Sequence, residues 1–376
     1  MKTIWQTKKL GEILKLEYGK PLAKPDRKED GKYPVYGANG VKNFSNKFYF
    51  SKPSIIVGRK GSAGEIKLTN DKFWPLDVTY FVTFDDKKYN LKFLFNLLKL
   101  LNLPKLAKGV KPGINRNDVY SIEISVPSLR DQIRIVKILD EVFEKIAKAK
   151  ENTEKNLQNA KELFESYLQS VFANPGKDWE EKKLGDVCDF VRGPFGGSLK
   201  KSIFKKEGYV VYEQQHAIYN QFTKVRYFID EKKFNEMKRF ELKSGDLIMS
   251  CSGTMGKIAI APDGIKKGII NQALLKLTPS KNLLNVFLKD WMKSGVFQDD
   301  LKTYTKGAAI KNVVSVKILK GIKIFVPKMQ EQKSIVAKLD ALSAETKKLE
   351  TIYKHKLMDL EELKKSVLKK AFSGEL

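Results

Sequence analysis

Cysteine and histidine are scarce in this chain, which has 376 residues and contains only two of each. Cys188 and Cys251 form no Cys-x-x-Cys pair, and His216 and His355 lie far apart in the sequence. The sequence therefore supports neither a zinc site nor a disulfide framework, and it favours a reducing compartment. We expect both cysteines to be buried rather than reactive.

Long uninterrupted apolar runs are also missing. The first residues, MKTIWQTKKL, lack the apolar core of a secretory signal, and the most apolar stretch, Leu91 to Leu103, is interrupted by Lys92 and Lys99. We therefore expect neither a membrane segment nor a targeting peptide, and we predict a cytoplasmic location. The hydrophobic content of 42% is nevertheless high enough to build cores in about two or three domains.

Signatures of catalysis are absent as well. The sequence contains no phosphate-binding GxxxxGK[ST] loop, no GxGxxG, no GxSxG elbow and no HExxH. His216 lies in the polar run EQQHAIYN without a serine or aspartate at a recognisable spacing, so we interpret it as a structural or contacting residue. We expect no enzymatic activity from the chain alone. The opposing hypothesis, an intrinsic nuclease or methyltransferase, predicts activity from the purified chain.

Acidic residues are strongly outnumbered. The chain has 71 Lys and Arg against 44 Asp and Glu, a formal net charge of +27 and a pI near 9.7. Such an excess predicts a polyanionic partner, and nucleic acid is favoured over an anionic membrane surface because no segment resembles an anchor. A lysine-rich but merely soluble surface is the alternative.

Much of the chain occurs twice. VPSLRDQIRIVKILDEVFEKI begins at Val126 and VPKMQEQKSIVAKLDALSAET begins at Val326, and the offset of 200 then persists to Phe172 and Phe372. Earlier matches have smaller offsets: 174 for KKLGEI and KKLGDV, 192 for a glycine pair and 198 for a Lys-Gly pair. Because the offsets rise and then stay constant, the sequence indicates a tandem duplication with equal helical segments and unequal globular parts.

The repeat predicts an α+β fold with pseudo-two-fold symmetry. Short β-rich runs, one of them from Ile269 to Leu277, alternate with turns in the globular parts, whereas apolar residues recur at spacings of three and four in the helical segments. A narrow apolar stripe needs a partner, so we expect the two long helices to form an antiparallel coiled coil; a parallel intermolecular coiled coil is the alternative. The expected domains are residues 1–127, 128–175, 176–327 and 328–376, the first and third globular and the others helical.

Polar, glycine-framed loops follow several apolar strands and are the candidates for contact with a nucleic acid. Glycine lets the backbone approach a partner closely, Arg and Lys pair with guanine edges or phosphates, and Ser or Thr can bind either. An ordinary hairpin turn is the alternative for each loop. The candidate residues are Tyr36, Asn39, Arg59, Lys60, Ser62, Lys108, Lys111, Asn115 and Arg116 in the first globular part, and Gln214, Gln215, His216, Ser250, Ser252, Thr254, Lys257, Lys306, Lys311 and Asn312 in the second.

The two proline-led helices, ending in LQSVFANPG and LKKAFSGEL, resemble the paired helical regions of the specificity subunit of type I restriction-modification enzymes. KKLGEI, KKLGDV and SGDLIMSCSGTMGKI are similar to the opening and middle of that family's target recognition domains. The chain departs in one detail, because the first helix has Asp131 before Gln132 where the second has the commoner Glu331.

The resemblance implies a prokaryotic, non-catalytic DNA reader without a cofactor of its own. Each target recognition domain would read one half of a bipartite asymmetric site, and the helices would set the spacer and dock two modification subunits. Those subunits carry S-adenosylmethionine and methylate adenine at N6, and restriction subunits that use ATP and Mg can join them. A stand-alone DNA-binding scaffold or regulator with a coiled-coil spacer is the alternative function.

Overall fold

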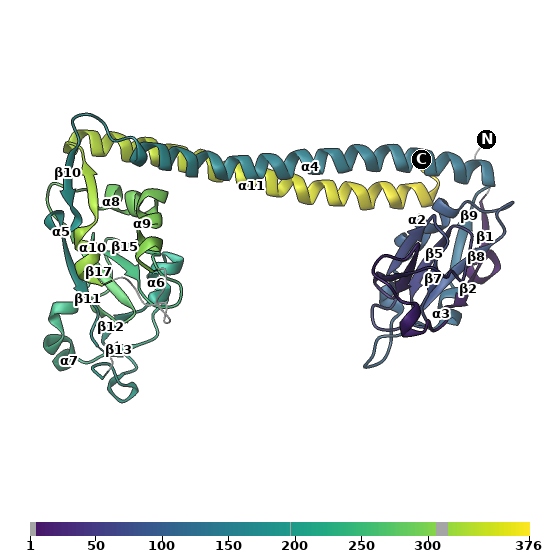
Figure 1. Cartoon of the computed structure of the whole chain (residues 1–376), viewed down its shortest axis with the longest axis horizontal. Helices are drawn as coiled ribbons and strands as arrows, with labels where there is room; N and C mark the ends of the chain where they lie inside the picture. The colour runs from purple at the N-terminus through teal and green to yellow at the C-terminus, as the bar shows by residue number, and fades with distance from the viewer. Residues whose placement is uncertain (1–4, 196, 306–314) are drawn as a thin grey trace. The chain divides into compact units, whose positions relative to one another are not determined.

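The computed structural model describes residues 5–195, 197–305 and 315–376, and Figure 1 shows its helices and strands. The chain forms two compact units, Met1–Glu154 with His355–Leu376, and Lys155–Lys354. Two helices of 45 residues each, α4 (Leu129–Ala173) and α11 (Met329–Ser373), contribute a part to both units. Among the described residues, every helix is too short or too polar to cross a membrane.

The globular part of the first unit is built on a four-stranded antiparallel sheet, whose strands in order are β2 (Leu14–Tyr18), β8 (Thr79–Phe84), β5 (Ser54–Gly58) and β6 (Ile66–Thr69). Strand β5 is buried along its whole length between two neighbours, which explains its continuous apolar run. Helix α2 covers the sheet, and its Phe93 and Leu97 share a buried cluster with Val57 of β5. Asn90 caps this helix, since its side-chain oxygen accepts a hydrogen bond of 3.0 Å from the Phe93 amide.

The elements of this first globular part are short. The large sheet consists of β2 (Leu14–Tyr18), β8 (Thr79–Phe84), β5 (Ser54–Gly58) and β6 (Ile66–Thr69). The second sheet consists of β4 (Gly40–Ser45), β3 (Tyr33–Gly37) and β7 (Trp74–Pro75), and a separate pair consists of β1 (Gln6–Lys9) and β9 (Glu123–Val126). The helices are α1 (Leu10–Ile13), η1 (Lys24–Asp26), α2 (Leu91–Leu101), η2 (Leu103–Leu106) and α3 (Arg116–Tyr120).

The second unit repeats this plan, with sheet orders β11-β17-β14-β15 and β13-β12-β16 and a pair β10-β18. The strands are β10 (Glu180–Lys183), β11 (Cys188–Arg192), β12 (Tyr209–Tyr212), β13 (Phe228–Ile229), β14 (Leu247–Ser250), β15 (Ile258–Ile260), β16 (Gly268–Ile270), β17 (Leu274–Pro279) and β18 (Lys323–Val326). The helices are α5 (Leu184–Val187), η3 (Lys201–Ile203), α6 (Gln214–Tyr219), α7 (Glu231–Glu236), η4 (Lys238–Phe240), α8 (Asn285–Lys293), α9 (Gly295–Thr305) and α10 (Val316–Gly321). The matching strand orders confirm the duplicated α+β fold.

One strand expected from the sequence is wrong. The run from Ile269 to Leu277 is two strands, β16 and β17, which belong to different sheets. The Asn271 side chain accepts a hydrogen bond of 3.0 Å from the Ala273 amide, and the Asn271 carbonyl accepts one of 3.1 Å from the Leu274 amide. This asparagine turn redirects the chain within an otherwise apolar run.

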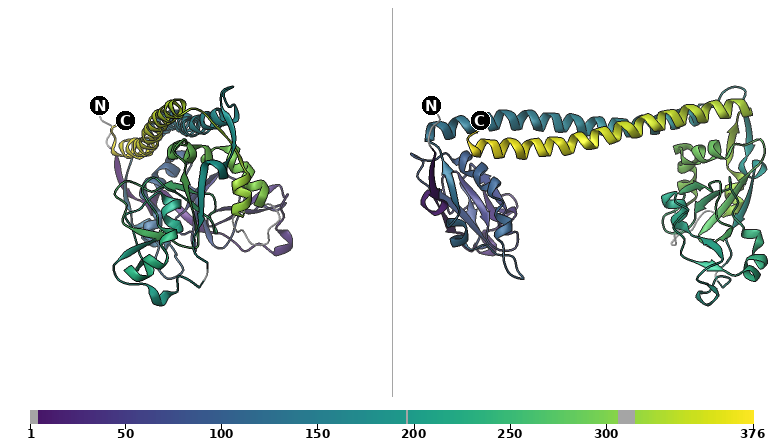
Figure 2. Two further views of the ribbon diagram at one scale, coloured as in Figure 1. Left: turned by 90° about the vertical axis from the view of Figure 1, so that its left-hand side faces the viewer. Right: turned by 180° about the vertical axis from the view of Figure 1, so that it is seen from behind.

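The long helices pair antiparallel inside each unit. In the first unit, Lys150 of α4 forms an ion pair of 2.8 Å with Glu361 of α11, and the Arg134 guanidinium donates to the carbonyl of Leu376 at 3.3 Å. In the second unit, Leu168 near the end of α4 and Leu339 near the start of α11 share one buried cluster. Figure 2 shows the start of α4 beside the end of α11 in the first unit. The partner stripe is therefore intramolecular, as the antiparallel prediction requires.

A glutamine that occurs at the same position in both repeats hydrogen-bonds the start of each long helix to its own globular part. Gln132 is fully buried; its side-chain oxygen accepts from the Asn90 amide at 2.8 Å, and its nitrogen donates to the carbonyls of Lys88 and Pro127 at 3.2 and 3.0 Å. Gln332, equally buried, makes the same three bonds with Leu284, Asn282 and Pro327 at 2.8, 2.9 and 2.9 Å. The two glutamines therefore occupy equivalent positions in the two units.

Replacing Gln132 by alanine should lower the free energy of unfolding of the first unit by about 3 kcal/mol, because one amide and two carbonyls lose their partners in a buried place. Gln332→Ala should do the same in the second unit. Urea unfolding and hydrogen exchange of α2 and α8 would measure both effects. The side chain of the exposed Gln158 of α4 donates to Glu162 in the same helix, so Gln158→Ala is the control, with an expected loss below about 0.5 kcal/mol. Unchanged protection of α2 in Gln132→Ala would contradict this account.

Candidate nucleic-acid interface

The positive charge of the chain is concentrated in its globular parts. Residues 1–128 contain 24 Lys and Arg against 12 Asp and Glu, and residues 174–328 contain 29 against 16. Helix α4 contains 8 of each, and α11 contains 10 against 7. A polyanion is therefore attracted to the two globular parts, whereas the helices present nearly balanced charge.

In the first unit, the structure joins two loops that the sequence singles out. The Ile114 amide donates to the Arg59 carbonyl at 3.0 Å, and the Gly61 amide donates to the Pro112 carbonyl at 2.9 Å. Gly61 and Gly109 have positive φ angles of 83° and 91°, which side chains rarely adopt. Residues 59–62 and 108–116 thus form one continuous surface.

Two arginines of this surface stack on one tyrosine. The Cζ atoms of Arg59 and Arg116 lie 5.4 and 5.1 Å from the ring centroid of Tyr18, whose side chain is 45% exposed at the end of β2. The Arg59 Nε and Nη2 atoms donate to the Asp77 carbonyl at 3.0 and 2.6 Å. This arrangement orients two guanidinium groups while leaving further donors for a partner. We name Tyr18, Arg59 and Arg116 the arginine-tyrosine cluster.

Tyr80 packs against Tyr18 of the arginine-tyrosine cluster. Its ring centroid lies 5.1 Å from that of Tyr18, and its hydroxyl donates to the Ile114 carbonyl at 3.2 Å. Burial, together with the neighbouring Tyr18, raises the pKa of Tyr80 to about 12, although Arg59 and Arg116 act in the opposite direction. Tyr80 is therefore a neutral donor at physiological pH, and its bond to Ile114 joins β8 to the loop that leads into α3 and Arg116.

The remaining candidates of the first unit have different environments. Asn39 and Ser62 are exposed and line one recess of about 500 Å³ with Gly109. The other exposed candidates are Lys60, Lys111, Lys108, which is paired with Asp118 at 2.9 Å, and Asn115, which caps α3. Tyr36 requires a correction: it is only 8% exposed and packs edge-on against Phe73 in the core, so its side chain is not available to DNA.

In the second unit, the structure again joins two loops singled out by the sequence. The Gln214 side chain accepts a hydrogen bond of 3.2 Å from the Ser252 amide, which brings residues 214–216 to the loop after β14. Ser252, Thr254 and Lys257 are exposed, and Gln214 and Gln215 are half-buried. Lys306, Lys311 and Asn312 lie outside the described residues.

Two candidates of the second unit are structural, which corrects the expectation that they contact DNA. Ser250 is fully buried, and its oxygen accepts from the Lys257 amide at 3.0 Å. His216 is also fully buried; its Nδ1 accepts from the Glu213 amide at 2.9 Å, and its Nε2 lies 3.1 Å from the Lys224 carbonyl. Both side chains hold loops in place.

Beside His216 lies an ion pair that the sequence analysis missed. The buried carboxylate of Glu213 accepts two hydrogen bonds from Arg226, at 3.0 Å to Nε and 2.7 Å to Nη2. The Arg226 guanidinium also lies 5.3 Å from the Tyr227 ring centroid and is well exposed. The pairing raises the pKa of Arg226 through its hydrogen bond to Glu213. An arginine so held has a defined orientation toward solvent.

The arginine-tyrosine cluster is not repeated in the second unit. At the offsets of the duplication, the residue equivalent to Tyr18 is Arg192, the one equivalent to Arg59 is Cys251, and the one equivalent to Arg116 is Val316. Burial raises the pKa of Cys251 to about 11 against the influence of Arg192, and burial raises that of Cys188 to about 12. Both thiols are thus neutral and buried, as expected. The two surfaces have the same architecture and different chemistry.

No group of three or more His, Cys, Asp or Glu side chains that could hold a metal ion occurs in the described part of the chain. What the exposed candidates share is the ability to donate hydrogen bonds to phosphates and base edges. Among the described residues, these surfaces contain Arg, Lys, Ser, Thr, Asn and Gln around glycine turns. This chemistry suits recognition.

Comparison with known proteins agrees with this chemistry. The sequence matches the family described as Type I restriction modification DNA specificity domain over residues 3–158 and again over 176–357. The type I restriction enzyme EcoDI specificity subunit of Escherichia coli is 24% identical over 409 residues, which cover 99% of this chain and 88% of the relative.

Two solved structures have a similar fold. One is a chain from a study of complex assembly and conformational transition of the type I R-M system, with a TM-score of 0.77 and 19% identity, covering 99% of this chain and 98% of that chain. The other is the HsdS subunit from Thermoanaerobacter tengcongensis, with a TM-score of 0.65 and 19% identity, covering 99% of this chain and 97% of that chain.

The resemblance noted from the proline-led helices is thereby confirmed, since the family match takes in both globular parts and more than half of each long helix. The chain belongs to the type I restriction modification DNA specificity family, and it is the non-catalytic DNA specificity subunit of a type I restriction-modification system.

Proposed function

We propose that residues 1–127 and 176–327 are two target recognition domains, each of which reads one half of a bipartite, asymmetric DNA site. The observation that supports this proposal is the distribution of charge along the chain, because each globular part has a large excess of Lys and Arg and the helices do not. In this proposal, the helical segments 128–175 and 328–376 set the distance between the half-sites.

The two half-sites differ because the two surfaces differ. In the first domain, the arginine-tyrosine cluster offers guanidinium groups suited to the O6 and N7 acceptors of guanine. In the second, Ser252, Thr254 and Lys257 surround a glycine turn, beside the amides of Gln214 and Gln215. Amide and hydroxyl groups suit adenine or phosphates.

The partners in this proposal are double-stranded DNA and two modification subunits, which dock on the side of the long helices and carry S-adenosylmethionine. Restriction subunits that use ATP and Mg extend the complex into a nuclease. Because these subunits act on DNA, our proposal includes a location in the cytoplasm of a prokaryote. The balanced charge of α4 and α11 is compatible with a protein partner rather than DNA.

Mapping N6-methyladenine in a host that expresses this chain together with its modification subunit tests the proposal. We expect one bipartite motif with two different halves and a fixed spacer, absent when this chain is omitted. A palindromic motif bound by a dimer of this chain, without a modification subunit, would instead support the stand-alone regulator.

The affinity for a cognate duplex should depend strongly on salt. A chain of net charge +27 binding through many phosphate contacts should lose roughly a thousandfold or more in affinity between 50 and 200 mM salt, because DNA counterions are released on binding. Fluorescence anisotropy titrations at several salt concentrations would measure this slope. An affinity that stays flat over this range would contradict the electrostatic part of the proposal.

A further inference from the structure

Arg226 lies on the surface of the second unit, where two neighbours hold its side chain. The buried carboxylate of Glu213 accepts hydrogen bonds from Nε and Nη2 at 3.0 and 2.7 Å, yet the Arg226 side chain is 61% exposed. Its Cζ atom lies 5.3 Å from the ring centroid of Tyr227, which stacks on Phe204 with the centroids 4.5 Å apart. Because Glu213 occupies only Nε and one hydrogen of Nη2, Nη1 and the second Nη2 hydrogen can bind a partner.

The backbone on either side of Arg226 is fixed as well. The Nε2 atom of the buried His216 lies 3.1 Å from the Lys224 carbonyl. The Tyr227 carbonyl accepts a hydrogen bond of 2.9 Å from the Val211 amide of β12. A side chain that is oriented before its partner arrives loses less conformational entropy on binding, so Arg226 is prepared for a specific contact.

The segment that carries Arg226 belongs to the candidate interface of the second unit. Residues 213–227 connect β12 to β13, whereas the equivalent strands of the first unit, β3 and β4, are joined by a tight turn at residues 38–39. Gln214 in this segment accepts a hydrogen bond of 3.2 Å from the amide of Ser252, in the loop after β14. The longer connection, which includes α6, therefore distinguishes the second unit from the first and lies against one of its candidate DNA-contacting loops.

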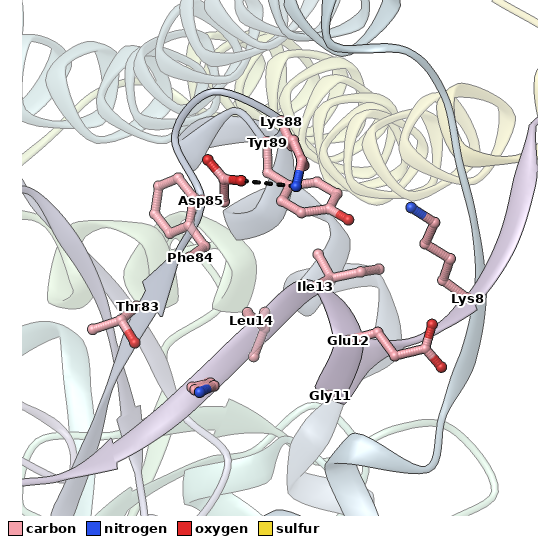
Figure 3. A pocket seen from close by; sticks show the side chains of 11 residues that line it. Lys8, Gly11, Glu12, Ile13, Leu14, Thr83, Phe84, Asp85, Lys88 and Tyr89 are labelled. Atoms are coloured by element: carbon pink, nitrogen blue, oxygen red, sulfur yellow. Dashed lines mark ion pairs between the residues drawn. The ribbon is translucent and has the colours of Figure 1, made fainter.

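Other ion pairs of the chain do not orient a donor in this way. In the first unit, Lys88 pairs with Asp85 at 3.2 Å, and both line a recess of about 580 Å³ (Figure 3). Their side chains are 71% and 43% exposed, so water competes with this pair and it contributes little. Arg226 differs because its carboxylate partner is buried and accepts two parallel hydrogen bonds, which fix the plane of the guanidinium.

We propose that Arg226 reads a guanine in the half-site of the second domain, by donating from Nη1 and the second Nη2 hydrogen to O6 and N7 in the major groove. The inference rests on the proposed function and deepens it by naming the residue and the base that it selects. Guanine presents two acceptors at this edge, whereas adenine presents one acceptor and one donor. A fork that only donates, and that Glu213 holds in place, therefore discriminates in favour of guanine.

Methylation mapping tests the inference in a host that expresses the full-length chain together with its modification subunit. Arg226→Ala should relax one guanine position in one half of the methylated motif and leave the other half unchanged. Arg226→Lys keeps the charge but not the planar fork, so it should relax the same position. Arg239→Ala removes an exposed arginine of η4 in the same unit and is the matched control, with an unchanged motif expected.

Binding of a modified duplex tests the contact with guanine directly. Replacing the guanine at that position by 7-deazaguanine removes the N7 acceptor and leaves base pairing intact. The complex of the unchanged chain should bind this duplex about tenfold more weakly than the cognate duplex. The complex of the Arg226→Ala chain should bind the two duplexes equally, because it no longer donates to N7. Competition titrations followed by fluorescence anisotropy would measure both ratios.

Thermal unfolding of each variant checks that the fold is intact. A folded Arg226→Ala chain with an unchanged motif overturns the inference. So does a variant that binds all sequences more weakly by the same factor, since that result identifies a phosphate contact. Both outcomes leave the reading of two half-sites by two domains in place. If the complex of the unchanged chain methylates no bipartite motif, the proposed function itself fails.

Discussion

Replacing Arg59 and Arg116 together by alanine should abolish recognition of one half of the DNA site and leave recognition of the other half intact. Each guanidinium that makes a bidentate contact with guanine contributes about 1–3 kcal/mol of discrimination. The double variant should therefore bind a cognate duplex about 2–6 kcal/mol more weakly, provided the two contacts are independent. Competition binding with duplexes that carry changes in one half-site or the other would measure the loss.

Substitutions of Tyr18 test whether the aromatic ring itself is needed to orient the two arginines. Tyr18→Phe keeps the ring on which both arginines stack and should retain recognition, whereas Tyr18→Leu removes the ring and should relax the same half-site. Lys24→Ala, which removes an exposed positive charge elsewhere in the first unit, is the control and should reduce affinity for all sequences alike. The account is wrong if the Arg59 and Arg116 double variant retains the full motif.

Shortening both long helices by seven residues should shorten the spacer of the recognised DNA site by about three base pairs, because seven helical residues span about 10 Å. The deletions are residues 151–157 of α4 and 354–360 of α11, which follow Lys150 and precede Glu361, the two ends of an observed ion pair. Seven residues are close to two helical turns, so the apolar seam is preserved. Methylation mapping would report the new spacer.

Two controls separate spacing from stability. Removing four residues from both helices rotates the seam and should prevent assembly, and removing seven residues from α4 alone leaves helices of unequal length and should do the same. In the paired deletion, each half-site should keep its sequence. An active complex with an unchanged spacer would refute the proposal that the helices set the distance.

The sequence predicted the repeat and the long helices because both depend on local patterns. The constant offset from Pro127 to Phe172 requires helices of equal length, and α4 and α11 have 45 residues each. The short β-rich runs of the globular parts also predicted strands, and the structure has short strands there. In contrast, the turn at Asn271 was missed because one polar residue in an apolar run can still belong to a strand.

The candidate interface was predicted only in part. Arg59 and Arg116 were chosen for their residue type in glycine-rich loops, and the structure brings them together on Tyr18. Tyr18 was missed because it ends a strand far from both loops in the sequence. Tyr36, His216 and Ser250 were chosen for the same chemical reasons as the arginines, but all three are buried.

The family, the duplication, the basic character and the equal helices follow from the amino-acid sequence, because motifs, offsets and charge are properties of residue order and composition. Which polar side chains face solvent, and which bonds hold Gln132 and Gln332, depends on the folded chain. Burial and long-range hydrogen bonds join residues that are far apart in the chain, so residue type and spacing alone do not specify them.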